Sequence, residues 1–321
     1  MTALRQHLPQ SVRRLWHTDA PLTATGLLML GLLCGTLIGL WLDPRTIAGA
    51  PAWLKPAKFS LSIAVYTLTL AWVFGFLGAW RRMRRFVSLT TATVLIMEFA
   101  IIALQTWRGT TSHFNVGTPL DAALFGLMGA GIALQTLVST AVAVALWRQS
   151  FDDPALGWAL RLGMTISILG ASTGGLMTAP TAAQLDAART NGRLTIAGAH
   201  TVGAPDGGPG VPGTGWSREH GDIRVAHFVG LHALQALPLI ALMLYRRRCS
   251  DSVRVRLTQV TGGGYGAFFA LLLWQALRGQ SVVAPDTVTI AAFATVSAAT
   301  ATALWRARMR GGEMGQSANA L

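Results

Sequence analysis

Residues 81–109 read RRMRRFVSLTTATVLIMEFAIIALQTWRG, a block of arginines followed by a long apolar run. The run at 86–107 is long enough to cross the hydrocarbon core of a bilayer, for which an α-helix needs about 20 residues. Glu98 is the only acidic residue deep within it. Arginines at one end are typical of a loop on the cytoplasmic side of a membrane. The stretch therefore predicts a transmembrane helix that carries one buried carboxyl group.

The composition of the whole chain agrees with this interpretation. Hydrophobic residues make up 52% of the 321 residues, charged residues make up only 12%, and the mean hydropathy is +0.46. These values are too apolar for a soluble domain of this length. A formal net charge of +13 could indicate nucleic-acid binding, but the arginines occur in short clusters between apolar runs. We therefore exclude nucleic acid as a partner and expect the lipid bilayer instead.

Eight apolar runs of this kind follow one another along the chain. They predict an all-α fold, a polytopic bundle of about eight transmembrane helices that forms a single membrane domain over 1–321. One of the runs is more polar than the rest, because Arg161 and several small polar residues dilute it. The expected spans are 22–42, 59–80, 86–107, 120–147, 157–178, 223–245, 257–277 and 287–305.

The distribution of the basic residues predicts the orientation of these spans. Cytoplasmic loops carry an excess of Lys and Arg, and most of the 26 basic residues fall in alternate connections. We expect both termini and the loops at 81–85 and 246–256 to be cytoplasmic, and 108–119 and 179–222 to lie outside. The first apolar run is too long for a cleaved signal peptide, so we interpret it as a retained span. The expected location is the plasma membrane or the bacterial inner membrane.

Short motifs recur between the two halves of the chain. Each motif lies at the beginning or the end of an expected span, and an arginine cluster follows the second span and the sixth. A parallel four-plus-four duplication, as is common in membrane transporters, would explain the recurrence. Chance similarity between apolar helices is the alternative. The matching pairs are Gln105 with Gln275, Arg108 with Arg278, and Lys58 with His227.

The segment 179–222 is the only long connection between expected spans. Its middle, GAPDGGPGVPGTG at 203–215, is too rich in Gly and Pro for a helix or a regular strand. Polar and aromatic residues follow at 216–224, directly before the next span. Long loops over a rigid scaffold often act as lids. We therefore expect this segment to be either a lid over a site or a plain connector.

Ionisable residues within a span usually face the bundle interior or a water-filled cavity, because a charge in hydrocarbon is costly. Glu98 lies about 13 Å along the helix from the outer end of its span. Gln105 falls on the same face of that helix, and Arg108 stands at its mouth. His113, in the turn that follows, can reach the same group. These residues predict a polar site on the outward half of the bundle.

The sixth span carries a second set of polar residues on one side. His227, His232 and Gln235 fall within one arc of a helix, together with Arg224. His232 is expected at a depth close to that of Glu98. We therefore predict that both groups face one interior cavity.

The second span opens with the only two lysines of the chain. Lys55 and Lys58 lie directly before the expected start of this span, and Tyr66 follows Lys58 on the same face of the helix, near the middle of the bilayer. A compact ammonium group suits a phosphate, carboxylate or propionate ligand. Attraction to lipid headgroups is the alternative explanation. A small anionic ligand is therefore one expected partner.

Three kinds of function fit these residues. The first is a metal or haem site for redox or related chemistry, although His227 and His232 are five residues apart and so do not form a two-histidine site on one helix. The second is a proton-coupled small-molecule transporter, in which Glu98 and His232 exchange protons. The third is a non-catalytic role, in which the polar groups only pack helices together.

The sequence does not choose among these functions, and it leaves open whether the protein is an enzyme. No Gly-x-Ser-x-Gly elbow or other nucleophile motif is present. Each class nevertheless has its own candidate residues. They are Glu98, His232 and Tyr66 for catalysis; Lys55, Lys58, Arg108, Gln105 and Gln235 for substrate binding; and His227, His232, Glu98 and His113 for a metal ion or haem.

Overall fold

Helices account for most of the structure, and most of the helices are long and apolar. A computed structural model describes residues 9–246 and 249–318, with side chains up to residue 309, so residues 247–248 of the expected loop 246–256 lie outside the described part. It is 73% helical with almost no sheet, which confirms the all-α fold. Within the described residues, seven helices are long and apolar enough to cross a membrane, and a bent pair makes eight if it is one span. The chain is therefore compatible with a multi-pass membrane protein.

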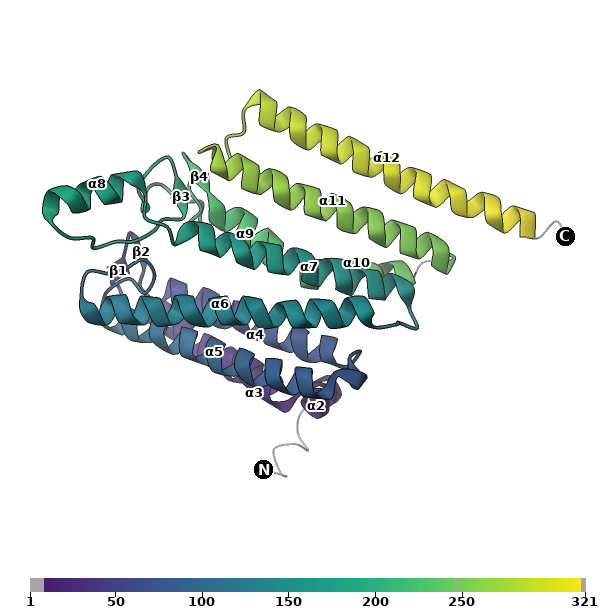
Figure 1. Ribbon diagram of the computed structural model, residues 1–321, viewed down its shortest axis with the longest axis horizontal. Helices are drawn as coiled ribbons and strands as arrows, with labels where there is room; N and C mark the ends of the chain where they lie inside the picture. Colours follow the sequence, from purple (N-terminus) through teal and green to yellow (C-terminus); the bar gives the residue numbers. More distant parts are fainter. Residues whose placement is uncertain (1–8, 247–248, 319–321) are drawn as a thin grey trace. The chain divides into compact units, whose positions relative to one another are not determined.

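Figure 1 shows the elements in chain order, with two short antiparallel hairpins between long helices. They are α2 (Gln10–Thr18), α3 (Ala20–Leu42), β1 (Thr46–Ile47), β2 (Ala50–Pro51), α4 (Leu54–Phe74), the 3-10 helix η1 (Gly78–Trp80), α5 (Arg81–Trp107), α6 (Pro119–Arg148), α7 (Pro154–Met177), α8 (Ala182–Asn191), β3 (Thr201–Val202), β4 (Gly221–Asp222), α9 (Ile223–Leu231), α10 (Ala233–Tyr245), α11 (Asp251–Leu277) and α12 (Thr287–Ala318).

Most helices contain the expected spans and extend beyond them, but α4 is shifted from the expected 59–80. It begins at Leu54 and ends at Phe74, and the chain then turns at Gly75 and enters η1. Hydropathy locates the apolar middle of a helix, whereas caps and turn residues set its ends. Lys55 and Lys58 therefore lie inside the first turns of α4 rather than before it.

The chain divides into two compact units. Unit 1 comprises residues 1–145 and 180–198, and unit 2 comprises residues 146–179 and 199–321. Unit 1 contains α3 to α6, and unit 2 contains α7, the pair α9 and α10, α11 and α12. Each unit thus contains four consecutive expected spans, as a four-plus-four repeat predicts.

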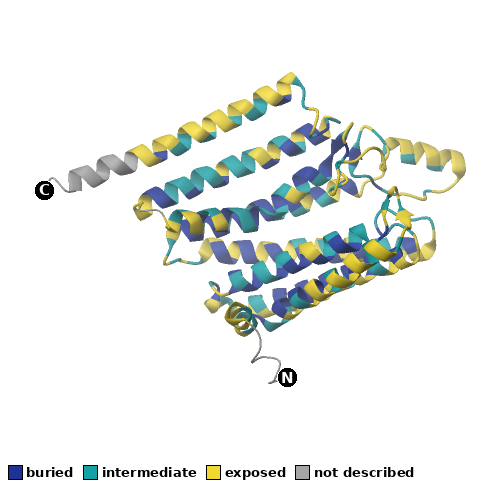
Figure 2. Cartoon of the chain, turned by 180° about the vertical axis from the view of Figure 1, so that it is seen from behind, coloured by how far each residue is buried: buried dark blue, intermediate teal, exposed yellow. Residues whose placement is uncertain are grey.

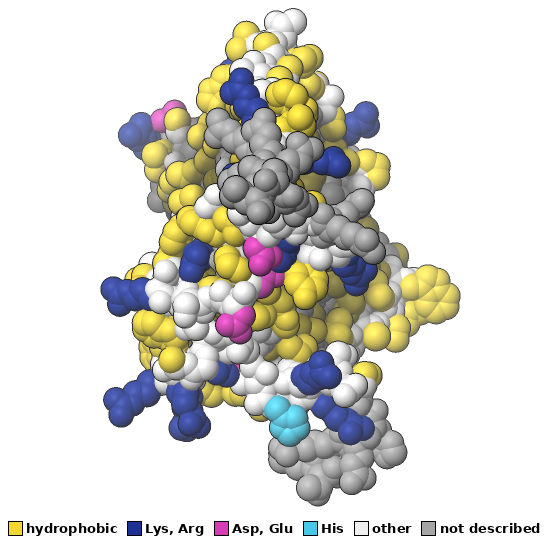
Figure 3. Space-filling view, turned by 90° about the vertical axis from the view of Figure 1, so that its right-hand side faces the viewer, with side chains coloured by type: hydrophobic (Ala, Val, Ile, Leu, Met, Phe, Trp, Pro, Cys, Tyr) yellow, Lys and Arg dark blue, Asp and Glu magenta, His cyan; other side chains and the backbone are white. Residues whose placement is uncertain are grey.

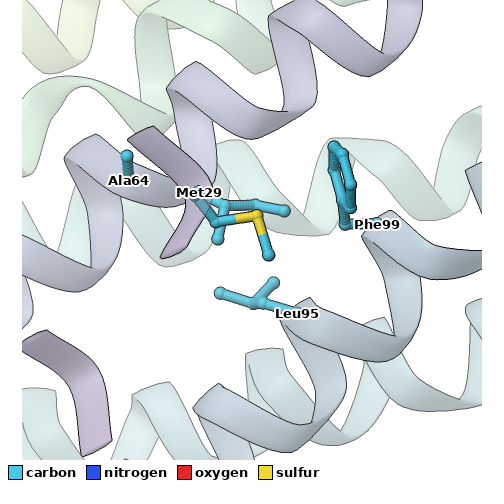
Figure 4. Close-up of a cluster of buried hydrophobic side chains, with 5 residues drawn as sticks. Met29, Ala64, Leu95 and Phe99 are labelled. Carbon is cyan, nitrogen blue, oxygen red and sulfur yellow. The ribbon is translucent and has the colours of Figure 1, made fainter. Parts of the chain in front are cut away.

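In unit 1, α3 and α4 pack closely and both contact α5. Met29, Ala64, Leu95 and Phe99 from these three helices meet in one buried cluster (Figure 4). Gly26 permits the close approach, because a Cβ atom there would lie 2.6 Å from Leu68. Small residues at such contacts are typical of helix packing in membranes.

Unit 2 is built on an equally close contact between α7 and α9. A Cβ atom on Gly170 would lie 2.6 Å from the backbone of Gly230, so neither position has room for a side chain. The contact continues into α10, where a Cβ atom on Gly163 would lie 2.9 Å from the carbonyl oxygen of Ala233. Helix α11 also packs on α7, α9 and α10.

The α9–α10 span is bent by 45° at His232. Pro238 lies inside α10, and a proline there removes one backbone hydrogen bond and tends to bend the helix. Side chains bind carbonyl groups near the bend: Tyr265 Oη donates to Val229 O at 2.6 Å, and Ser167 Oγ donates to Leu231 O at 3.1 Å. Irregular backbone within a membrane span needs such partners.

The two units repeat individual contacts as well as helix order. In unit 1 the Arg84 guanidinium binds Thr18 O and lies 5.6 Å from the Phe74 ring; in unit 2 Arg254 binds Asp153 and lies 4.8 Å from the Tyr245 ring. The first long helix of each unit, α3 and α7, is preceded by an N-cap aspartate, Asp19 and Asp153, whose side chain accepts a hydrogen bond from the first turn.

The ends of α5 and α11 repeat each other too. Gln105 Nε2 donates to Thr111 O at 3.5 Å, and Gln275 Nε2 donates to Ser281 O at 2.8 Å. The glycines that follow have the same left-handed conformation, with φ of 73° at Gly109 and 74° at Gly279. These pairs share both sequence and geometry, which favours duplication over chance.

Much of the exterior is apolar. Figure 2 shows long exposed stretches on α12, whose most apolar window is only 6% buried. Val288, Ile290 and Trp305 are more than half exposed there. Hydrophobic side chains also make up much of the surface in Figure 3, where Lys and Arg stand out among them. Such a surface suits contact with lipid rather than with water.

The segment 179–222 is divided between the two units. Residues 180–198 belong to unit 1 and contain α8, which starts with a capping box formed by Thr181 and Gln184. Residues 199–222 belong to unit 2, where β3 pairs with β4. Between those strands, 203–215 contains neither helix nor regular strand, as its Gly and Pro content predicts.

Candidate functional site

Three of the expected site residues form a continuous line in unit 1. Nε2 of His113 lies 3.4 Å from Oε1 of Glu98, and Nδ1 of the same ring lies 2.9 Å from Nζ of Lys55. Lys55 comes from the first turn of α4, Glu98 from α5 and His113 from the turn between α5 and α6. The β1–β2 hairpin directly precedes α4. We therefore call the end of unit 1 that holds Lys55 and His113 the hairpin end.

The contacts of Lys55 determine the tautomer of His113. A lysine ammonium group can only donate hydrogen bonds, so Nδ1 accepts from it. Ser112 Oγ, 3.2 Å from Nδ1, can donate to the same atom. In the neutral ring the proton therefore resides on Nε2, the nitrogen that faces Glu98. The three groups therefore form one line of polar contacts from Lys55 through His113 to the carboxyl group.

Glu98 is the buried end of this line. Its side chain is 2% exposed, and Oε2 has no hydrogen-bond partner among the described residues. Apolar residues Leu95, Phe99, Ile101 and Ile102 surround its position on α5, and all are buried. A carboxyl group with one unpartnered oxygen in such surroundings is well suited to gain and lose a proton.

Aromatic rings enclose His113. Phe59, one turn after Lys55, lies 5.7 Å from the His113 ring, Phe114 lies at 6.2 Å and Phe125 at 6.5 Å, measured between centroids. The ammonium of Lys55 is 5.9 Å from the Phe59 ring. These rings limit the motion of the imidazole, whose side chain is 29% exposed.

Gln105 and Arg108, which the sequence predicts to bind substrate, both bind Asp121. Gln105 Nε2 donates to Asp121 Oδ1 at 2.8 Å, and Arg108 Nη1 donates to the same oxygen at 2.6 Å. The Arg108 guanidinium also binds Gln105 Oε1. Unit 2 has a similar arrangement, in which Arg278 binds Asp286 at 2.7 Å. The recurrence of the arginine–aspartate pair favours a structural role for Arg108, joining α5 to α6.

Tyr66 lies in a separate polar cluster deeper in unit 1. Its Oη is 3.1 Å from Ser139 Oγ and accepts from Gln135 Nε2 at 3.2 Å. Both partners belong to α6, and Gln135 Oε1 is buried without a hydrogen-bond partner in the described part of the chain. The sequence did not identify Gln135 or Ser139, because a helical stripe gives no information on which other helix it will face.

Lys58 lies one turn beyond Lys55 on α4 and is half-buried. The two lysines thus occupy the same end of the helix, as the sequence predicts. Trp53 stands directly before them and donates from Nε1 to Asp43 at 2.8 Å, which ties the hairpin to α4. Hydrogen bonds from Arg45 and from Trp53 hold the pKa of Asp43 well below its usual range. This loop is therefore a rigid support for the lysines.

The histidines of the sixth span belong to unit 2. Nδ1 of His227 lies 2.8 Å from the carbonyl oxygen of Gly170 and 3.3 Å from Thr173 Oγ1. A carbonyl oxygen only accepts, so Nδ1 carries the proton and Nε2 is left as the basic nitrogen. The described residues provide no hydrogen bond to that nitrogen. His227 is thus oriented as histidines that bind metals commonly are.

His232 stands at the bend between α9 and α10. Its ring packs at a tilt of 59° against Phe228, with 4.3 Å between the centroids, and the Phe228 ring in turn lies 5.7 Å from the Trp216 ring. A side-chain hydrogen bond joins His232 to Gln235. His232 and Gln235 therefore interact with each other, on the same side of the helix as the sequence predicts.

Four residues were expected as ligands of a metal ion or haem, and they fall in two sets. Glu98 and His113 meet in unit 1, whereas His227 and His232 belong to unit 2. Throughout the described ranges, no three His, Cys, Asp or Glu side chains are grouped so that they could hold a metal ion. Both cysteines, Cys34 and Cys249, are exposed and unpaired by disulfide.

Comparisons with protein-family models, with curated proteins and with solved structures found no match for this sequence.

Proposed function

We propose that the protein is a proton-coupled transporter of a small anion, in which Glu98 carries the proton. The observation that carries the proposal is the line Lys55–His113–Glu98, with distances of 2.9 and 3.4 Å, which ends on a buried carboxyl group. Ionisable residues within spans that contact one another often form proton relays in pumps and transporters. A chain of this kind passes a proton to Glu98 without exposing the carboxyl group itself.

The repeat of four spans supports the same function. Transporters are often built from two structural repeats of the same helices. The repeats can share their helix packing and still differ in the residues of the binding site. Here the structural contacts of Arg84 and Arg108 in unit 1 recur at Arg254 and Arg278 in unit 2. The residue of unit 2 that corresponds to Glu98 is Phe268, so the carboxyl group is not repeated. A group retained in only one repeat, at a position that costs stability, is best explained by function.

The solute in this proposal is an anion, because the only two lysines of the chain stand beside the relay on α4. A cation that approaches Lys55 would be repelled, whereas a carboxylate or phosphate group would be attracted. Ligand binding to the ammonium would also compete with its hydrogen bond to His113. Binding of the anion and protonation of Glu98 would thereby be coupled.

Transport can be tested with purified protein in liposomes that contain a trapped pH-sensitive dye. Inorganic phosphate or pyruvate is added outside, and acidification inside is followed. We expect at least one of these anions to drive acidification, and Glu98→Gln to reduce its rate at least tenfold, because an amide carries no exchangeable carboxyl proton. Glu219→Gln, at an exposed loop position, is the matched control. Equal rates in all three proteins would contradict the proposal.

Haem binding in unit 2 is a second candidate, favoured by the orientation of His227. Its Nδ1 is held by Gly170 O at 2.8 Å, and one or two histidines suffice to ligate haem iron. A visible spectrum of the purified protein tests this function. A haem band that is lost in His227→Ala and kept in His17→Ala would support it, since His17 is exposed on α2. A colourless protein would leave no support for it.

A third function, helix packing alone, makes a different prediction for the same variants. Glu98→Gln would then lower the melting temperature without any change in acidification. A buried hydrogen bond in a membrane bundle contributes on the order of 1 kcal/mol. Measuring both quantities on one preparation separates packing from transport.

A further inference from the structure

Phe114, next to His113, has a backbone conformation that bulky residues rarely adopt. Its φ of +64° lies in the left-handed region, where a side chain with a Cβ atom is strained. Asn115 closes the turn around it by donating from Nδ2 to Thr110 Oγ1 at 2.9 Å and accepting at Oδ1 from the Gly117 N–H at 3.1 Å. Strained residues persist where surrounding contacts hold them, and they cluster at functional sites.

The contacts that hold Phe114 come from a distant part of the sequence. The N–H of Ala197 donates to Phe114 O at 2.8 Å, and the N–H of Val116 donates to Thr195 O at 3.0 Å. Asn115 and Ile196 form an antiparallel bridge between these two bonds. We call residues 192–198, which follow α8, the strap. The strap pairs with the turn like a short strand and fixes its backbone on both sides of Asn115.

A single side chain anchors the strap to α8. Gln184 Nε2 donates to Gly198 O at 2.8 Å, and its Oε1 accepts from the Gly198 N–H at 3.1 Å. Oε1 also accepts from the Thr181 N–H at 3.0 Å, at the start of α8. The amide of Gln184 thus satisfies both backbone groups of one strap residue. Removing it frees the end of the strap that pairs with Phe114.

We infer that Gln184 is a positioning residue for His113, acting through the strap. Its amide fixes Gly198, the strap fixes the backbone at Phe114, and that backbone directs the neighbouring His113 ring between Lys55 and Glu98. Release of the strap lets Phe114 relax to an unstrained conformation and withdraws the imidazole from the carboxyl group. The consequence for transport rests on the proposed function. With the strap in place the proton path from Lys55 through His113 to Glu98 is complete, and release of the strap interrupts it.

The position of His113 can be measured without any transport assay. Diethyl pyrocarbonate modifies accessible neutral histidines, and mass spectrometry reports the rate at each residue. We expect Gln184→Ala to increase modification of His113 at least threefold and to speed hydrogen exchange at the amides of Val116 and Ala197. Asp186→Ala is the matched control on the same helix, because Asp186 only forms an exposed ion pair with Arg189. It should leave both rates unchanged.

Gln184→Glu provides an intermediate variant that keeps the helix start. It retains an acceptor for the Gly198 and Thr181 N–H groups but loses the donor to Gly198 O, so His113 modification should rise less than in Gln184→Ala. If exchange at Val116 and Ala197 rises while His113 modification does not, the strap does not position His113 and the inference is wrong. Unchanged exchange in Gln184→Ala overturns it as well.

These outcomes are distinct from failure of the proposed function. If Glu98→Gln leaves acidification in liposomes unchanged, transport through Glu98 is wrong. The modification rates of His113 in the Gln184 variants would still decide whether the strap positions that ring, because they report only on geometry.

Discussion

Nζ of Lys55 lies 2.9 Å from Nδ1 of His113. Because Nδ1 accepts this hydrogen bond, the proton of the neutral ring is on Nε2, the nitrogen that faces Glu98. Without Lys55 the two neutral tautomers of His113 would both be populated, and one of them presents a bare nitrogen to the carboxyl group. In the proposed relay, the lysine therefore sets the direction of proton transfer.

Replacing Lys55 should accordingly disturb His113. In Lys55→Met we expect the nitrogen NMR shifts of labelled histidine to change from one tautomer to a mixture. Acidification in liposomes should fall at least tenfold, because a positioned acid–base group typically contributes about 10²–10⁴-fold. Arg148→Met removes an exposed charge from α6 and serves as the control. A single tautomer retained in Lys55→Met would mean that another group orients the ring.

The close contact of α7 with α9 predicts a strong effect of one methyl group. In Gly170→Ala the new Cβ would lie 2.6 Å from Gly230, and overpacking of this kind usually costs about 1–3 kcal/mol. Gly175→Ala, on the same helix, meets nothing within 4 Å and should be neutral or slightly stabilising. Thermal melting in detergent compares the two. Equal melting temperatures would show that the helices can separate without cost.

Asp222 predicts a pH dependence in unit 2. Burial acts to raise the pKa of this carboxyl group, but hydrogen bonds from Arg224 and from the Ser217 N–H outweigh it, so the pKa lies below the ordinary 3.8. Its contribution to stability is therefore complete above pH 3.8 and is lost as pH falls through the lowered value. Asp222→Asn should cost about 2 kcal/mol at neutral pH.

The measurement for Asp222 is hydrogen exchange at Ser217, whose N–H donates to Asp222 Oδ2 at 2.8 Å. Protection there should fall in acid in the native protein and be low at every pH in Asp222→Asn. Asp206→Asn is the comparison, because that carboxylate binds the N–H of Thr201 instead. Protection of Ser217 that does not depend on pH would contradict the role assigned to Asp222.

Orientation in the membrane is a further prediction. With Cys34 and Cys249 replaced, a cysteine at Gly208 should react with an impermeant maleimide added outside, and one at Ala79 only after the membrane is opened. Gly208 has no neighbour within 4 Å of a new Cβ atom, and Ala79 is exposed, so neither change disturbs packing. The reverse pattern would place the hairpin end of unit 1 in the cytoplasm.

The helical spans could be predicted from the sequence because crossing hydrocarbon requires a long apolar run, whatever its neighbours are. The start of α4 could not, since Lys55 and Lys58 are polar and yet lie in the helix. Hydropathy gives no information on helix caps. It also does not predict that carbonyl groups near the bend at His232 are bound by side chains from α7 and α11.

The candidate site was predictable only in part. Glu98 was identified because it is a charged residue within a span, and His113 because it lies in the turn that follows that span. These two side chains do contact each other. The partners of Tyr66 and of Arg108 were not predictable, because they depend on which helices pack together. The left-handed Phe114 and its strap were also missed, since sequence gives no sign of a strained bulky residue.

Infrared spectroscopy of the carboxyl groups tests the role of Glu98 most directly. A protonated carboxyl group in apolar surroundings has a stretching band apart from those of solvated acids and of amides. We expect a band that appears and disappears with pH in the native protein and in Glu219→Gln but is missing from Glu98→Gln. A titrating band that persists unchanged in Glu98→Gln would show that another group carries the proton, and it would contradict the proposed relay.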